Sequence, residues 1–156
     1  LLSATFTTFS AGDKSYMGDM SLENLGSNAF KVDLVEFGYA NEFSADLSQT
    51  VTWVTGFDTD TTDADDSFTI AGDFSGIDLV SNDTVVAEVI SPFNYSKSCE
   101  YGMVDGIMTI NMNGPNVTFE TGSIDFISED GCLDLFQINV SDGTDDVTVV
   151  KTFKGF

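Results

Sequence analysis

Histidine and arginine are both missing from this sequence, and the five basic residues are all lysine. Without histidine the chain can build neither a Ser-His-Asp nor a Cys-His catalytic arrangement, and it cannot form a zinc site based on imidazole. Without arginine it lacks the planar guanidinium group that binds carboxylates and phosphates through two hydrogen bonds. These absences exclude most classes of enzyme, and we expect a protein that is not an enzyme.

Positive charge is scarce as well, because 26 acidic residues give the chain a net charge of −21. Such a surface repels the phosphate backbone of nucleic acids and anionic lipid headgroups. The sequence also lacks the ~18–20 consecutive apolar residues that a membrane-spanning helix needs. We therefore expect neither nucleic-acid binding nor membrane insertion, and partners among cations, glycans and proteins.

Cysteine occurs only twice, at Cys99 and Cys132. Three runs are rich in β-branched and aromatic residues, Met103–Met112, Val117–Ile127 and Cys132–Val140; Cys99 lies just before the first run and Cys132 starts the third. Gly, Asn and Asp separate the runs and favour turns. An antiparallel meander would bring both cysteines to one end of the sheet, either as a disulfide or as two buried free thiols.

The same features predict a compartment. A disulfide persists only where conditions are oxidising, and the chain begins Leu1-Leu2, which we interpret as a processed or truncated form. Four N-x-S/T sequons are permitted glycosylation sites in a secreted protein: Asn82, Asn94, Asn116 and Asn139. We expect an extracellular or cell-surface protein from which a signal peptide has been removed.

Strict alternation of apolar and polar residues predicts strands along the rest of the chain. Leu1–Phe9 alternates cleanly, and Ala29–Tyr39 alternates with a change of apolar face at Leu34/Val35, which favours a β-bulge or a strand that passes between layers. We expect a further strand at Val85–Ile90 to stop at Pro92. No window has the spacing of an amphipathic helix. The prediction is an all-β fold, an antiparallel meander forming a β-sandwich or barrel-like single domain over residues 1–156, with essentially no helix.

A family resemblance covers residues 49–153. It rests on Thr52-Trp53, Phe68–Gly72 with Ser75-Gly76, Ser91-Pro92-Phe93, Ser98–Tyr101, Val104-Asp105-Gly106, Asp125-Phe126 and Glu129–Asp134. In these motifs the chain resembles a family of secreted β-rich lipoproteins of unknown function from Bacteroidetes. It departs from that family at Ile127 and Leu135, and no lipid-attachment cysteine stands near its start. The resemblance implies an extracellular β-rich module and supplies no catalytic residue.

Carboxylates are the remaining candidates for metal binding or catalysis. Asp58, Asp60, Asp63, Asp65 and Asp66 form the most acidic run, and oxygen ligands on a loop suit calcium. The run fails as an EF-hand, so we expect either a weak calcium site or a solvated loop, and no other cofactor. A carboxylate pair such as Asp105 and Asp125 could serve a glycosidase, although a solvent-facing role is the simpler interpretation.

Aromatic rings could stack on sugars, and Tyr16, Tyr39, Trp53, Tyr95 and Tyr101 are the candidates. Their alternation with apolar residues favours packing instead. Two functions therefore stand out. The first is a structural module that assembles with copies of itself or other surface proteins, as in a fibre, through a detachable or exchanged N-terminal strand, residues 1–11, whose apolar positions are Leu2, Ala4 and Phe6. The second is a carbohydrate-binding or adhesive module with weak calcium binding.

Overall fold

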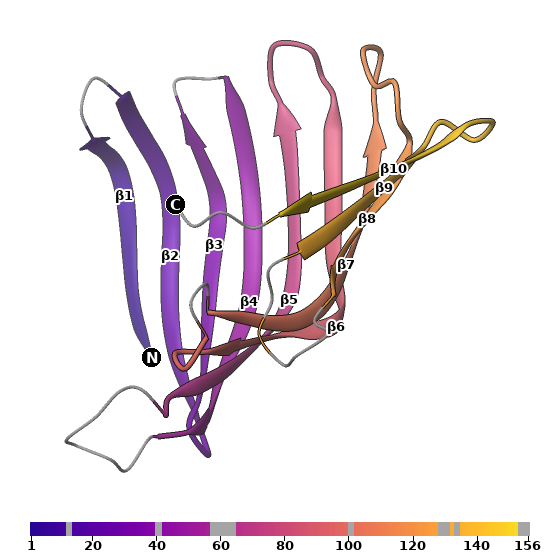
Figure 1. The fold of residues 1–156 in the computed structure, drawn as a ribbon. Helices are drawn as coiled ribbons and strands as arrows, with labels where there is room; N and C mark the ends of the chain where they lie inside the picture. The colour runs from indigo at the N-terminus through magenta and orange to yellow at the C-terminus, as the bar shows by residue number, and fades with distance from the viewer. Residues whose placement is uncertain are drawn as a thin grey trace.

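The chain forms one antiparallel sheet of ten strands, in which each strand pairs with its neighbours in sequence (Figure 1). This computed structural model describes residues 1–11, 14–39, 42–56, 65–99, 102–127, 132 and 135–152. The strands are β1 (Leu2–Ala11), β2 (Lys14–Gly26), β3 (Ala29–Tyr39), β4 (Phe43–Thr55), β5 (Ser67–Asp78), β6 (Thr84–Ser96), β7 (Met103–Asn113), β8 (Thr121–Ile127), β9 (Leu135–Ser141) and β10 (Asp146–Thr152).

The predicted all-β antiparallel meander is confirmed. It is one open sheet rather than two packed sheets, and within the described residues β1 pairs only with β2 and β10 only with β9. The sheet twists strongly, so β9 and β10 run obliquely to β1–β5 (Figure 1). The described part of the chain contains no helix that could span a membrane.

Each face of the sheet carries a continuous row of residues that pair across nine strands. The apolar row is Met20, Leu34, Leu47, Phe74, Ala87, Ile110, Gly122, Val140 and Val147. The polar row is Ser21, Asp33, Ser48, Asp73, Glu88, Thr109, Ser123, Asn139 and Thr148. Because neighbouring side chains on a strand point to opposite faces, these rows define an apolar face and a polar face.

The change of apolar face that the sequence shows in β3 is a β-bulge. Leu34 pairs with Leu47 and Phe37 pairs with Ala45, so β3 holds one extra residue between the two pairs. Glu36 lies in this interval with a φ of 50°. The extra residue brings Leu34 and Phe37 to the same face, which keeps the apolar face continuous along β3.

Pro92 does not end its strand, contrary to the prediction, because β6 continues to Ser96. The pairing of β6 with β5 shifts between Ile70 and Asp73, and its pairing with β7 shifts on both sides of Ser91. A proline cannot donate to the ladder but is tolerated at such irregularities. Two other strands start later in the chain than predicted. β8 begins at Thr121 rather than Val117, and β9 begins at Leu135 rather than Cys132.

Glycine allows the strands to approach closely near these irregularities. Gly106 has a φ of 142°, and a Cβ added there would lie 2.3 Å from the Phe93 ring. Gly72 has a φ of 145°, and its added Cβ would lie 2.0 Å from the Ser48 carbonyl oxygen. Any side chain at either position would push neighbouring strands apart.

The apolar face is only thinly covered. Among the described residues, Ala87 and Cys99 are the only apolar side chains that are buried outright. The chain exposes 9843 Å² of surface, whereas a compact monomer of 16.8 kDa exposes about 7,600 Å². An open sheet explains the difference, because within the described residues each strand contacts only its neighbours in the sheet and no second layer packs on the apolar face.

Candidate functional site

Asp66, at the end of the acidic run, makes an ion pair and a backbone hydrogen bond with Lys97. Asp66 is 5% exposed, and its carboxylate pairs with the Lys97 ammonium group at 3.5 Å. The Lys97 amide also donates to the Asp66 carbonyl oxygen at 2.9 Å, which ties the start of β5 to the end of β6. Asp65 is described and exposed, whereas the other predicted calcium ligands, Asp58, Asp60 and Asp63, lie outside the described residues. Among the described residues no group of three His, Cys, Asp or Glu could hold a metal ion.

The predicted disulfide is present: Cys99 and Cys132 are bonded, with Cα atoms 5.3 Å apart. The bond joins the connection between β6 and β7 to the connection between β8 and β9. Cys99 is buried, and its amide donates to the Ser96 carbonyl oxygen at 3.1 Å. The crosslink therefore fixes one end of the sheet where two long connections meet.

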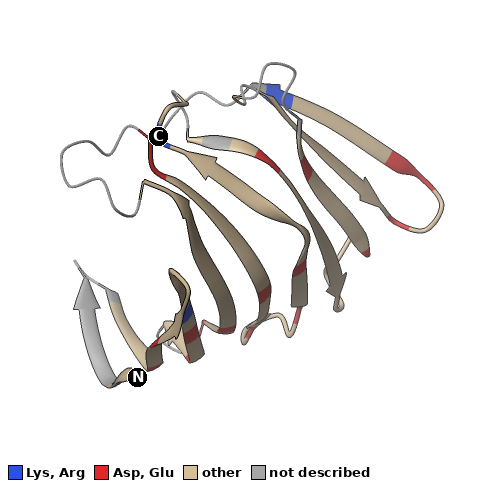
Figure 2. Ribbon diagram, turned by 90° about the horizontal axis from the view of Figure 1, so that it is seen from below, with Lys and Arg blue, Asp and Glu red and all other residues tan. Residues whose placement is uncertain are grey.

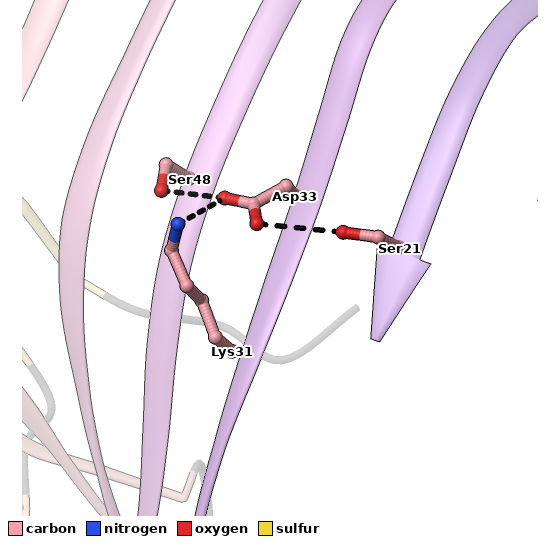
Figure 3. Close-up of polar contacts among 4 residues, drawn as sticks. All are labelled: Ser21, Lys31, Asp33 and Ser48. Carbon is pink, nitrogen blue, oxygen red and sulfur yellow. Dashed lines mark hydrogen bonds and ion pairs between the residues drawn. The ribbon is translucent and has the colours of Figure 1, made fainter. Parts of the chain in front are cut away.

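The polar face carries an ordered network around Asp33 (Figure 3). One carboxylate oxygen accepts from Ser48 Oγ at 2.7 Å and lies 2.9 Å from the Lys31 ammonium group, while the other accepts from Ser21 Oγ at 3.4 Å. The hydrogen bond from Ser48, followed by that from Lys31, lowers the pKa of Asp33. The network links β2, β3 and β4 across their polar row.

Asp105 and Asp125 also lie on the polar face. Asp105 is exposed and accepts a hydrogen bond from the Asn94 side-chain amide. Asp125 is half-buried and pairs across the strands with Ile107 and Gln137. Figure 2 shows acidic positions on many of the strands that it colours, with few basic positions among them, so these two carboxylates are part of a general pattern.

The four sequons fall into two environments. Asn82 and Asn116 are exposed and lie in connections between strands. Asn94 and Asn139 lie within strands, and their side chains bond across the polar face. A glycan on either of the latter two would be attached to the side-chain nitrogen that donates in these hydrogen bonds.

The aromatic side chains pack against one another. Tyr16 lies 5.5 Å from Phe37 and 5.5 Å from Tyr39, measured between ring centroids. Trp53 lies 5.0 Å from Phe68, which in turn lies 6.0 Å from Tyr95. The packing interpretation of these rings holds, while Tyr101 lies outside the described residues.

The apolar face contains a hollow of about 640 Å³ that the sequence did not predict. Strands β3 to β7 line it with Leu34, Phe37, Phe43, Leu47, Phe74, Val85 and Met112, and Val117 adds to the lining from the connection after β7. Two of the lining residues are small: Ala45 in β4 pairs with Gly76 in β5, and we call this pair the floor of the hollow. Finding it from sequence would require the strand register, which places these two small residues side by side.

No family model, curated protein or solved structure matches the chain. The resemblance to secreted Bacteroidetes lipoproteins therefore stays a prediction.

The two outer strands are the remaining candidates for an interaction surface. In β1, Leu2 pairs with Leu22, Ala4 with Met20 and Phe6 with Gly18, and the register shifts between Phe6 and Phe9. The predicted assembly strand thus lies in its own sheet. Its outer edge and the outer edge of β10 have no neighbouring strand within the described residues.

Proposed function

We propose that this chain is a non-catalytic structural subunit, outside the cell or at its surface, that assembles with copies of itself by β-strand addition. The observation that carries the proposal is the open sheet with an outer strand at each end. An unpaired strand edge presents a row of backbone N–H and C=O groups that can bind another strand.

The composition of β1 supports the proposal. Natural edge strands are commonly protected by charged residues, especially lysine, or by proline. The ten residues of β1, LSATFTTFSA, contain neither a charged residue nor proline. The pairs from Leu2↔Leu22 to Phe6↔Gly18 are regular, which leaves a five-residue stretch suited to strand addition.

The topology favours a head-to-tail contact between β1 of one copy and β10 of the next. Ten strands that alternate in direction leave β1 and β10 antiparallel, so a second copy in the same orientation continues the alternation. Such a contact joins two different surfaces and can repeat without closing, which produces a filament.

The two rows of the sheet suggest the register. Ser3 pairs with Ser21 and so extends the polar row, which ends at Thr148 on β10. If Ser3 of one copy lies opposite Thr148 of the next, Leu2 lies opposite Val149 and Ala4 lies opposite Val147. This register would continue the polar row and the apolar row from copy to copy.

Light scattering with paired variants tests the proposal. Val147→Lys with Val149→Lys adds two charges to the apolar positions of the β10 edge, where both side chains are exposed. The control, Val86→Lys with Ile107→Lys, adds the same charge at exposed positions of interior strands. We expect the unmodified chain and the control to form assemblies at high concentration and salt, and the edge variant to stay monomeric. A monomeric unmodified chain, or an edge variant that assembles equally well, would overturn the proposal.

The alternative of a carbohydrate-binding or adhesive module gains no comparable support from the described residues. The rings that it would use pack together, as in the Tyr16–Phe37 stack.

A further inference from the structure

The hollow on the apolar face lies away from the two edges of the sheet and carries an inference independent of the assembly proposal. We propose that this hollow binds a small amphiphile, with the apolar body of the ligand in the hollow and a cationic headgroup at its rim.

The size and lining of the hollow support a ligand with an apolar body. Its volume of about 640 Å³ falls within the range of about 300–1,000 Å³ that is typical of small-molecule sites. Most of the lining side chains are apolar, and they include three aromatic rings, those of Phe37, Phe43 and Phe74. Transfer of an alkyl chain from water into such surroundings is favourable by roughly 25 cal/mol for each Å² buried.

The hollow is a product of local structure. The bulge in β3 turns both Leu34 and Phe37 toward it. The Glu36 amide donates to the Asp46 carboxylate at 2.7 Å, which holds the bulge. Ala45 and Gly76, paired on adjacent strands, add little side-chain volume to the hollow, and the Phe74 ring lies over Gly76, 3.2 Å from where a Cβ would stand.

The charge at the rim selects the headgroup. Asp78 and Asp83 are the only charged residues among those that line the hollow. The Asp78 carboxylate accepts from the amides of Val80 and Ser81 at 2.8 and 3.0 Å. Asp83 accepts from the Asn116 amide at 3.1 Å. Both carboxylates are thus held in place at the rim, where they attract a cation and repel a fatty-acid carboxylate.

Calorimetry with three ligands of equal chain length tests both parts of the inference. The probes are decyltrimethylammonium, decanol and decanoate, each below its aggregation concentration and in 150 mM NaCl. We expect one saturable site for decyltrimethylammonium, with an affinity at least tenfold higher than that for decanol and higher still than that for decanoate. Equal affinity for the three probes, or no saturable binding of the cation, would overturn the inference.

Two variants separate the hollow from general attraction to an acidic surface. Ala45→Leu fills the floor of the hollow, while Ala71→Leu makes the same change on the opposite face of the neighbouring strand. Neither changes the charge of the protein. We expect Ala45→Leu to weaken binding of decyltrimethylammonium at least tenfold and Ala71→Leu to leave it unchanged. Equal binding by the two variants would contradict a site in the hollow.

A third variant tests the rim. Asp78→Asn with Asp83→Asn should reduce the preference for the cation over decanol to less than threefold while retaining binding of decanol. An unchanged preference would contradict the assignment of the rim. A ligand that binds only by dissociating a dimer, seen by sedimentation, would instead identify a second copy as the occupant and would also overturn the inference.

Discussion

Asp73 on β5 and Glu88 on β6 lie directly opposite each other in the polar row. Both side chains are exposed, and like charges at directly opposed positions destabilise a sheet. The pair is one place where the net charge of −21 brings two acidic residues together, and both side chains are in contact with solvent.

Replacement of Glu88 by lysine should therefore stabilise the protein. An opposite-charge pair with Asp73 would raise the free energy of unfolding by about 0.5–1 kcal/mol at low salt, and less at 1 M salt because the charges are screened. Chemical denaturation measures the change. Glu120→Lys is the control, because Glu120 is exposed and lies in the connection before β8. An equal gain in the control would assign the effect to net charge alone.

The bulge in β3 should depend on the Asp46 carboxylate. Its oxygen accepts from the amide of Glu36, a residue with a φ of 50°, and loss of one such hydrogen bond costs about 1 kcal/mol. We expect Asp46→Ala to unfold at lower denaturant concentration than Asp46→Asn, which removes the same charge but retains an acceptor oxygen. Identical midpoints for the two variants would show that the hydrogen bond does not hold the bulge.

The disulfide should contribute strongly to stability. Cys99 and Cys132 are 33 residues apart in sequence, and closing a loop of this length restricts the unfolded chain by about 3–4 kcal/mol. We expect Cys99→Ala with Cys132→Ala to lower the free energy of unfolding by about that amount. Denaturation of the unmodified chain with a thiol reductant should match the double variant. A loss below about 1 kcal/mol in both experiments would contradict this role.

The turn between β9 and β10 should weaken in acid. The amide of Asp145 and the hydroxyl and amide of Thr144 donate to the Asp142 carboxylate and lower its pKa to about 2. Because the pKa is lower in the folded state, ionised Asp142 stabilises the fold above pH 4, and this contribution is lost as the pH falls toward 2. Asp142→Asn should therefore be less stable than the unmodified chain at pH 6 and closer to it at pH 2. Denaturation at both pH values measures the difference, and a gap that does not narrow would contradict the assignment.

The strands were predictable from sequence because alternation is a local signal. β3 has the predicted bounds, and its bulge follows from the change of apolar face at Leu34/Val35. The continuation of β6 past Pro92 was missed because it depends on register shifts against both neighbours, which no local pattern records.

The hollow and the open sheet were harder to predict. Ala45 and Gly76 are 31 residues apart in the sequence, and only the register of β4 and β5 places them together. Alternation shows which residues share a face, but it does not show whether a second layer covers that face. The disulfide was easier to predict than the hollow, because the meander alone brings Cys99 and Cys132 to one end of the sheet.

Oxidative crosslinking of the proposed edge contact tests the central claim most directly. In a variant with Ser3→Cys and Thr148→Cys, the proposed register places the two new thiols opposite each other in neighbouring copies. The control combines Ser3→Cys with Val149→Cys, which moves the second thiol to the other face of β10. We predict a ladder of reducible oligomers for the first variant and mainly monomer for the control. Monomer alone from both variants, or equal ladders, would contradict assembly through β1 and β10.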